Sequence, residues 1–258
     1  METKGLLDVP RFDDPEYYLT SGEKTKITPL IQEVADRAKG KTDLELAQNM
    51  LSVMCDVTDS TRGEGPYGLD YERFKKTADT ILRNGKRTGS VDAVTLYASL
   101  LRARGIPAMQ ILTLHVPSAI DHLDWFTEGY MYNACFLRDG EGKGAWYVVN
   151  SGVSKLALSW TKFKPLNTED RNIEPDLYAF AYTRDYSDIN YKGVRINSEQ
   201  RMKELQRLAY GYCNKYDMAY AVQYLKDREE RRKREAEERT KKEAVKAKKP
   251  INPGQERE

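Results

Sequence analysis

A serine and an aspartate stand two positions apart at the start of an apolar run in the middle of the chain. Ser90 and Asp92 open the stretch SVDAVTLYASLLRARG, in which apolar residues recur at helical spacing until Gly105 ends the pattern. We expect Ser90 to be the N-cap of this helix, and Asp92 to lie in its first turn, where the helix dipole favours a negative charge. A serine hydroxyl at such a place can attack a carbonyl only when a neighbouring base removes its proton.

The two histidines are the first candidates for that base. His115 ends a predicted strand, and His122 lies in a predicted loop beside Asp121 and Asp124. A loop histidine that swings toward Ser90 would serve as a substitute base, whereas the simpler interpretation is a surface histidine without a catalytic role. The spacing of these histidines and aspartates matches no recognised metal site, so we expect no metal and no other cofactor.

The three cysteines, Cys55, Cys135 and Cys213, have no short CxxC spacing and are odd in number. This count argues against a disulfide framework and indicates a reducing compartment, so we predict a cytoplasmic protein. Cys55 ends the second predicted helix, where a free thiol is usually a small buried apolar group. A displaced nucleophile is the alternative, but no helix N-terminus or histidine is near it in sequence to activate the thiol.

Length and composition describe one sizeable domain with an appendage. The chain has 258 residues, a formal net charge of +2 and 40% hydrophobic residues. A balance this close to neutral excludes a chain that binds nucleic acid with its whole surface. The first residues show no basic segment followed by an apolar core, and no apolar run is long enough to cross a membrane. We therefore expect a soluble protein with no membrane partner.

The stretch 87–108 resembles the core of the transglutaminase-like superfamily, whose members are relatives of the papain-type cysteine proteases. In that family a Gly-Cys-x-Asp motif starts a buried helix that ends in Leu-Leu-Arg-Ala-x-Gly-Ile-Pro-Ala. The residues that fit this pattern are Gly89, Val91, Asp92, Leu100, Leu101, Arg102, Ala103, Gly105, Ile106, Pro107 and Ala108. Ser90 stands where the family has its nucleophilic cysteine.

The strands that follow extend the resemblance. The family has an antiparallel hairpin whose first strand opens with the catalytic histidine, and whose second strand ends with the aspartate that orients it. The aromatic positions of the family pattern are taken here by Tyr132, Phe136 and Trp146. The resemblance then puts Tyr130 at the histidine and Asn150 at the aspartate, while a register shifted by three residues would put Asn133 at the histidine.

These replacements remove the family's chemistry, in which a cysteine thiolate attacks an amide carbonyl. Tyr130 is neutral and a proton donor near pH 7, so it cannot accept the proton of Ser90, and Asn150 lacks the charge that would stabilise an imidazolium. We predict a catalytically inactive protein that keeps the family's cleft as a binding or scaffolding site for a protein or peptide. The residues expected around this cleft are Ser90, Asp92, Trp125, Tyr130, Tyr132, Trp146 and Asn150. The alternative is a serine-dependent hydrolase or acyltransferase in which His122 has become the base.

The predicted fold is α+β: a papain-like transglutaminase core over residues 25–205, with a charged helix added at the C-terminus. Helices are expected over 28–40, 42–54 and 71–84, followed by the buried central helix. Strands are expected over 109–116, 129–137 and 145–150 and should form an antiparallel sheet. Residues 1–24 are predicted to be an irregular arm, 206–249 a long helix and 250–258 a disordered tail.

The C-terminal segment 226–249 is nearly all charged, with twelve basic and seven acidic residues. Acidic residues precede basic ones by four positions at several places, and each such pair stabilises a helix by about 0.2–0.5 kcal/mol. A solvent-exposed helix from Lys226 to Lys249 is the simpler expectation. The weaker alternative is a basic arm that binds an acidic partner or nucleic acid, although the segment has no aromatic residue for base stacking.

Overall fold

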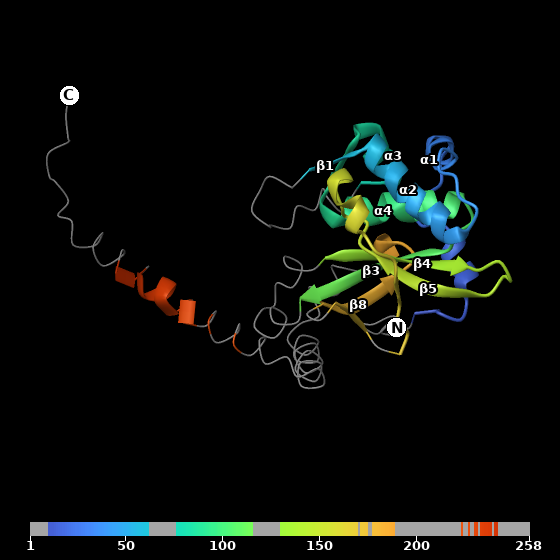
Figure 1. Ribbon diagram of the computed structural model, residues 1–258. Helices are drawn as coiled ribbons and strands as arrows, with labels where there is room; N and C mark the ends of the chain where they lie inside the picture. The colour runs from blue at the N-terminus through green and yellow to red at the C-terminus, as the bar shows by residue number, and fades with distance from the viewer. Residues whose placement is uncertain are drawn as a thin grey trace, which may run out of the picture.

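The computed structural model describes residues 10–61, 76–115, 130–169, 171–174 and 177–188, and parts of the segment 223–241. Within these residues the chain forms four α-helices that lie on one side of an antiparallel sheet (Figure 1). The mixed helical and antiparallel architecture predicted from the sequence is therefore confirmed. No helix among the described residues is long and apolar enough to cross a membrane.

The first three helices begin at threonine N-caps. These helices are α1 (Pro29–Ala35), α2 (Asp43–Val57) and α3 (Ala78–Asn84), with caps at Thr28, Thr42 and Thr77. In each case the threonine hydroxyl accepts a hydrogen bond from a backbone N–H in the first turn, which satisfies a donor that has no partner within the helix. The first helix is shorter than predicted, since it ends at Ala35 rather than near Gly40. The third helix is described only from Ala78, and residues 71–75 of its predicted range lie outside the described residues.

Helix α4 (Gly89–Ala103) is the central helix that the sequence predicts, and all its residues from Asp92 to Arg102 are buried. Its N-cap is Thr88 rather than Ser90, so the capping role expected for Ser90 is wrong by two residues. The carboxylate of Asp92 reaches back to accept a hydrogen bond from the backbone N–H of Thr88 at 2.8 Å. Ser90 is left free to contact the sheet.

The sheet has the strand order β6-β5-β4-β3-β8-β7. The three central strands that the sequence predicts are β3 (Ala108–His115), β4 (Met131–Arg138) and β5 (Gly144–Val149). The strands that it does not predict are β6 (Lys164–Pro165), β7 (Asn172–Glu174) and β8 (Leu177–Thr183). A separate parallel pair joins β1 (Asp59–Thr61) to β2 (Lys86–Thr88), just before α4. The register places Asn133 opposite Gln110 on one side and opposite Val149 on the other.

The two faces of the sheet carry two separate apolar cores. Cys135, Leu137 and Val149 face the helices. Alternate residues of the same strands, among them Tyr132 and Trp146, belong to the core on the opposite face. Residues 10–24, predicted to be an irregular arm, include the 3-10 helix η1 (Pro15–Leu19) and cover this second face with Phe12, Tyr17 and Tyr18. The ring centroid of Tyr18 lies 5.4 Å from that of Trp146.

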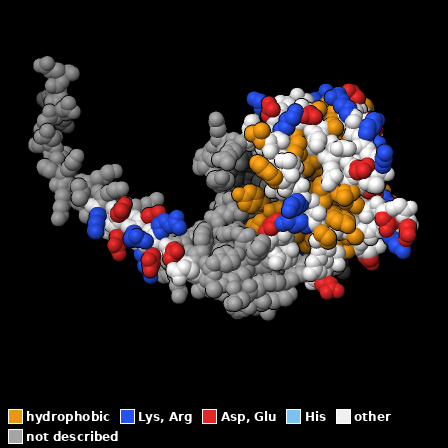
Figure 2. All heavy atoms as spheres, viewed as in Figure 1, with side chains coloured by type: hydrophobic (Ala, Val, Ile, Leu, Met, Phe, Trp, Pro, Cys, Tyr) orange, Lys and Arg blue, Asp and Glu red, His pale blue; other side chains and the backbone are white. Residues whose placement is uncertain are grey.

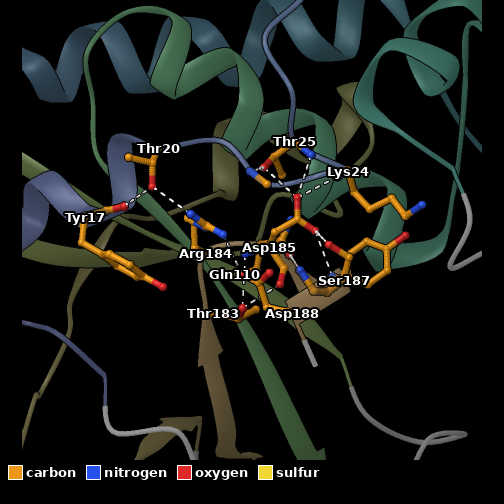
Figure 3. Close-up of polar contacts among 12 residues, drawn as sticks. Tyr17, Thr20, Lys24, Thr25, Gln110, Thr183, Arg184, Asp185, Ser187 and Asp188 are labelled. Atoms are coloured by element: carbon orange, nitrogen blue, oxygen red, sulfur yellow. Dashed lines mark hydrogen bonds and ion pairs between the residues drawn. The ribbon is translucent and has the colours of Figure 1, made fainter. Parts of the chain in front are cut away.

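A buried carboxylate fixes the end of this N-terminal stretch to the sheet (Figure 3). The Oδ2 atom of Asp185, just after β8, accepts hydrogen bonds at 2.8 Å from the N–H groups of Lys24 and Thr25 and from the Thr25 hydroxyl. Its Oδ1 atom accepts from the N–H and the hydroxyl of Ser187 at 2.9 and 2.7 Å. Burial raises the pKa of Asp185, but the hydrogen bonds from Ser187 and Thr25 outweigh it, so the pKa lies below its usual value.

Arg102, near the end of α4, continues this polar cluster. Its guanidinium donates hydrogen bonds to the Thr25 hydroxyl at 2.7 Å, to the carbonyl of Arg184 at 2.6 Å and to the carbonyl of Ala108. Burial lowers the pKa of Arg102 to about 10, so the guanidinium remains protonated at neutral pH. Helix α4, strand β3 and the N-terminal stretch are thereby joined at one buried point.

The described residues of the charged C-terminal segment are helical and exposed. Their hydrogen bonds join residues four apart, as between the Gln223 amide and Asp227 at 2.8 Å. These residues fall within the helix expected over 206–249, and the extent of that helix stays a prediction. The remaining parts of the predicted helix 206–249 and the predicted tail 250–258 lie outside the described residues.

Candidate functional site

Ser90 lies in the first turn of α4 and points at the start of β4. Its Oγ atom accepts a hydrogen bond from the backbone N–H of Met131 at 3.2 Å. Within the described part of the chain, this is the only hydrogen bond of the Ser90 side chain. The contact holds the N-terminus of the helix against the sheet.

The residues that follow β5 close the other side of Ser90. A Cβ atom added at Gly152 would lie 3.6 Å from Cα of Ser90 and 3.2 Å from Oδ1 of Asn150. That Asn150 oxygen accepts a hydrogen bond from the N–H of Gly152 at 3.0 Å. We call this meeting point of Ser90, Met131, Asn150 and Gly152 the Ser90 corner.

Two buried polar side chains, those of Asn133 and Ser151, lie next to the Ser90 corner. Asn133 and Ser151 are both fully buried, and the Ser151 hydroxyl donates to Oδ1 of Asn133 at 2.6 Å. The Asn133 amide donates to the carbonyls of Val94 at 3.0 Å and Met109 at 3.4 Å. Neither side chain titrates near neutral pH, so the pair ties α4 to the sheet without supplying a base.

Tyr130, the residue predicted at the family's histidine position, is 59% exposed. Its backbone carbonyl accepts hydrogen bonds from the N–H of Thr113 at 3.0 Å and from the Thr113 hydroxyl at 2.6 Å. The residue of β4 that contacts Ser90 is its neighbour Met131. A thioether side chain at that position offers no proton acceptor of useful strength.

Asp92 is buried, and its carboxylate is engaged in structural contacts. Besides the N–H of Thr88, it contacts the ammonium group of Lys76 at 3.0 Å. The Lys76 side chain is 28% exposed and the Asp92 side chain 1% exposed, so one ion of the pair is shielded from water. Asp92 therefore anchors the start of α4.

Arg87 is a buried cation directly before this helix, with 1% of its surface exposed. Its guanidinium donates to the Thr58 hydroxyl at 2.8 Å, to the carbonyls of Val153 at 3.1 Å and Ser151 at 3.4 Å, and to Sγ of Cys55 at 3.4 Å. These contacts place the residues after β5 against the end of α2. Arg87 thus fixes the backbone on both sides of Gly152 in the Ser90 corner.

Cys55 and Cys135 are buried free thiols. Burial raises the pKa of Cys55, and the opposing effect of the Arg87 guanidinium is smaller. Burial also raises the pKa of Cys135. Neither thiol is activated as a nucleophile, which supports the sequence-based interpretation of Cys55 as a buried apolar group.

The structure separates two residues from the cleft in which the sequence placed them. Tyr132 and Trp146 belong to the core on the face of the sheet opposite α4, and the indole N–H of Trp146 donates to the carbonyl of Phe12 at 2.9 Å. They therefore do not line a common cleft with Ser90, and that part of the expectation is wrong. Trp125 and His122 lie outside the described residues, as does the side chain of His115.

We also considered whether this site could bind a metal ion. Among the residues that the structure describes, no three His, Cys, Asp or Glu side chains converge on a point where they could hold a metal ion. The sequence pattern pointed to Ser90 and Asn150 but missed the hydrogen bond of Met131 to Ser90 and that of Ser151 to Asn133. No spacing rule signals these contacts, because they are tertiary and lie beyond Asn133 and Val149, where the paired register of β4 and β5 ends.

Comparisons with known proteins found similarity only to solved structures, and at low sequence identity. No protein-family model matches the sequence, and no curated protein matches it. A solved structure of a candidate cysteine protease from Cytophaga hutchinsonii aligns at 14% identity and a TM-score of 0.44 over 71% of this chain and 50% of that chain. A candidate protease from Parabacteroides distasonis aligns at 14% identity and a TM-score of 0.36 over 62% of this chain and 31% of that one. At these TM-scores neither similarity assigns the chain to a family.

Proposed function

We propose that this chain is a transglutaminase-like protein without catalytic activity, which binds a protein or peptide segment at the Ser90 corner. The resemblance of residues 87–108 to that superfamily supports the first part. The arrangement around Ser90 adds to it, because the N-terminus of a buried helix meets the start of β4 and the end of β5 at one point. These are the places from which the family draws its cysteine, histidine and aspartate.

One observation carries the inactive part of the proposal: the hydroxyl of Ser90 meets a backbone N–H, a donor, and no base among the described residues. An alcohol is too weak an acid to ionise at a helix N-terminus, since that dipole contributes about 0.3–2 kcal/mol. Attack by Ser90 therefore requires a proton acceptor in hydrogen-bond reach. Met131 and Asn133 on β4, and Ser151 after β5, are not such groups.

The alternative function is a serine-dependent hydrolase or acyltransferase in which His122 acts as the base. Ser90 is half-buried and not fully buried. The nucleic-acid-associated function through Lys226–Lys249 is a weaker alternative, supported by charge alone. The domain boundaries, the cytoplasmic location and the role of Trp125 stay predictions.

Labelling with a fluorophosphonate probe separates the first two functions. We expect the intact protein to gain no adduct on Ser90 after prolonged incubation, as judged by peptide mapping with mass spectrometry. Ser90→Ala gives the background, and exposed Ser154 gives the level of nonspecific reaction in the same digest. Rapid stoichiometric labelling of Ser90 that His122→Ala abolishes would establish the hydrolase or acyltransferase instead.

A further inference from the structure

Two large apolar side chains stand out of a short helix next to the Ser90 corner. Leu156 is 87% exposed and Trp160 is 77% exposed, both on the 3-10 helix η4 (Lys155–Trp160). Among the described residues, the other large hydrophobic side chains with high exposure are Tyr130 at 59% and Leu44 at 39%. Scattered apolar side chains at a surface are normal, but two strongly exposed large side chains within one six-residue helix concentrate apolar surface on a short segment, which we call the patch.

The segment that carries this patch is packed against the rest of the domain. Leu158, Val153 and Phe163 pack against the core on the helical side of the sheet. The ammonium group of Lys155 contacts the carboxylate of Asp56 in α2 at 2.5 Å. In Figure 1 the yellow turns of η4 lie in front of the helical layer, and Figure 2 shows hydrophobic atoms at the surface of this face. Leu156 and Trp160 therefore stand on a segment that is packed against the core and paired with α2.

The stretch of chain that carries the patch has basic residues and no acidic ones. Residues 151–168 contain three lysines and no acidic residue. Lys155 is paired with Asp56, and Lys164 is paired with Glu174 at 2.8 Å. Lys162 is exposed and forms no ion pair with any residue that the structure describes. A positive charge two positions from Trp160 is thus available to a partner.

We propose that Leu156, Trp160 and Lys162 form a docking surface for a polypeptide segment that carries an apolar anchor next to an acidic side chain. Exposed tryptophan is a typical energetic centre of protein interfaces, and a neighbouring lysine selects a carboxylate by charge complementarity. A nucleic acid fits less well, because backbone phosphates call for several cations and Leu156 offers no stacking surface. This inference rests on the proposed function for the class of ligand, a polypeptide.

The docking surface also adjoins the proposed binding site. Gly152 lies beside Ser90, and η4 begins three residues later at Lys155. A segment that lies along residues 152–160 would reach from the Ser90 corner to Trp160. The two sites would then be parts of one continuous surface.

The test uses selection of random twelve-residue peptides by display on the full-length protein. We expect the selected peptides to combine aspartate or glutamate with leucine, phenylalanine or tryptophan. Binding of a selected synthetic peptide, measured by calorimetry, should weaken at least tenfold in Trp160→Ser and in Lys162→Glu. Ser159→Ala, at the exposed position before Trp160, and Lys41→Glu, on an exposed site elsewhere, should bind as the wild type does. All four side chains are exposed, so the variants should keep the wild-type melting temperature, which is checked first.

Several results would overturn the inference. Peptides whose binding is unchanged in Trp160→Ser and Lys162→Glu would remove this surface and leave the proposed function standing. Selection of no peptide at all would contradict both. Wild-type self-association that Trp160→Ser abolishes would assign the patch to a second copy of the chain, and loss of binding to single-stranded DNA in that variant would assign it to nucleic acid. Labelling of Ser90 by the fluorophosphonate would contradict only the inactive part of the proposed function.

Discussion

The Ser151 hydroxyl donates a hydrogen bond to Oδ1 of Asn133 at 2.6 Å, and both side chains are fully buried under the Ser90 corner. Ser151→Ala would leave Asn133 with a buried acceptor that has lost its donor. We expect the free energy of unfolding to fall by about 1–3 kcal/mol, the usual penalty for an unsatisfied buried group. Urea denaturation measures this change, with the exposed Ser154→Ala as the matched control. An equal, small effect in the two variants would contradict the role given to the pair.

Arg87 should be sensitive to replacement even by lysine. Its guanidinium reaches Thr58, Cys55 and the carbonyls after β5 at the same time, which a single ammonium group cannot do. We expect Arg87→Lys to lower the free energy of unfolding by about 2–3 kcal/mol because buried acceptors lose their donors. Lys86→Met, at the adjacent exposed position, should change it little. Similar stabilities for the two variants would show that the buried contacts of Arg87 contribute nothing.

Asp185 makes the stability of the fold depend on acid pH. Its folded-state pKa lies below the usual value, so its contribution is complete above the pKa of an unfolded aspartate, about 3.9, and is lost as the pH falls through the folded-state pKa. Asp185→Asn should lower the free energy of unfolding by about 3 kcal/mol at pH 7, since its amide cannot accept from both Thr25 and Ser187. The difference from the wild type should shrink as the pH falls below about 4, as followed by urea denaturation. A difference that is constant with pH would contradict this account.

The charged C-terminal segment should not contribute to the stability of the rest of the chain. Its described residues are exposed, and their hydrogen bonds are local. Removal of residues 226–258 should leave the free energy of unfolding within about 0.5 kcal/mol of the full-length value. Circular dichroism during thermal unfolding checks the result. A large loss of stability would show that the segment packs on the domain, and steeply salt-dependent DNA binding lost on truncation would favour the nucleic-acid alternative.

Capping residues and hydrophobic periodicity, which act over a few residues, predicted the helices. Thr28 followed by Pro29 placed the start of α1, and helical periodicity after Gly89 placed α4. Strand β8 was missed although LYAFAYT is rich in residues that favour strands. Its pairing with β3 spans more than sixty residues of sequence, and only that pairing gives the segment its place.

The site residues stay a prediction, and the structure places two of them, Tyr132 and Trp146, on the other face of the sheet. Alternation along β4 separates Tyr132 from Asn133, but it does not say which of the two sets meets the helix. That choice depends on the N-terminal aromatic residues, such as Tyr18, which cover the other face. Ser90 was assigned to the cap for a similar reason, because a serine before an apolar run looks the same whether its hydroxyl faces the helix or the neighbouring strand. The interaction with Met131 is a tertiary contact that no spacing rule contains.

The absence of a proton acceptor at Ser90 is tested most directly by a thiol placed there. In Ser90→Cys, the rate of alkylation of residue 90 by iodoacetamide is followed against pH by peptide mapping, which separates it from the native cysteines. Without a base, the thiol should titrate with a pKa of about 7–8.5, since the helix N-terminus alone contributes about 0.3–2 kcal/mol, or up to about 1.5 pKa units. A pKa below about 6, of the kind produced by a paired histidine, would show that a base faces this position and would contradict the inactive assignment.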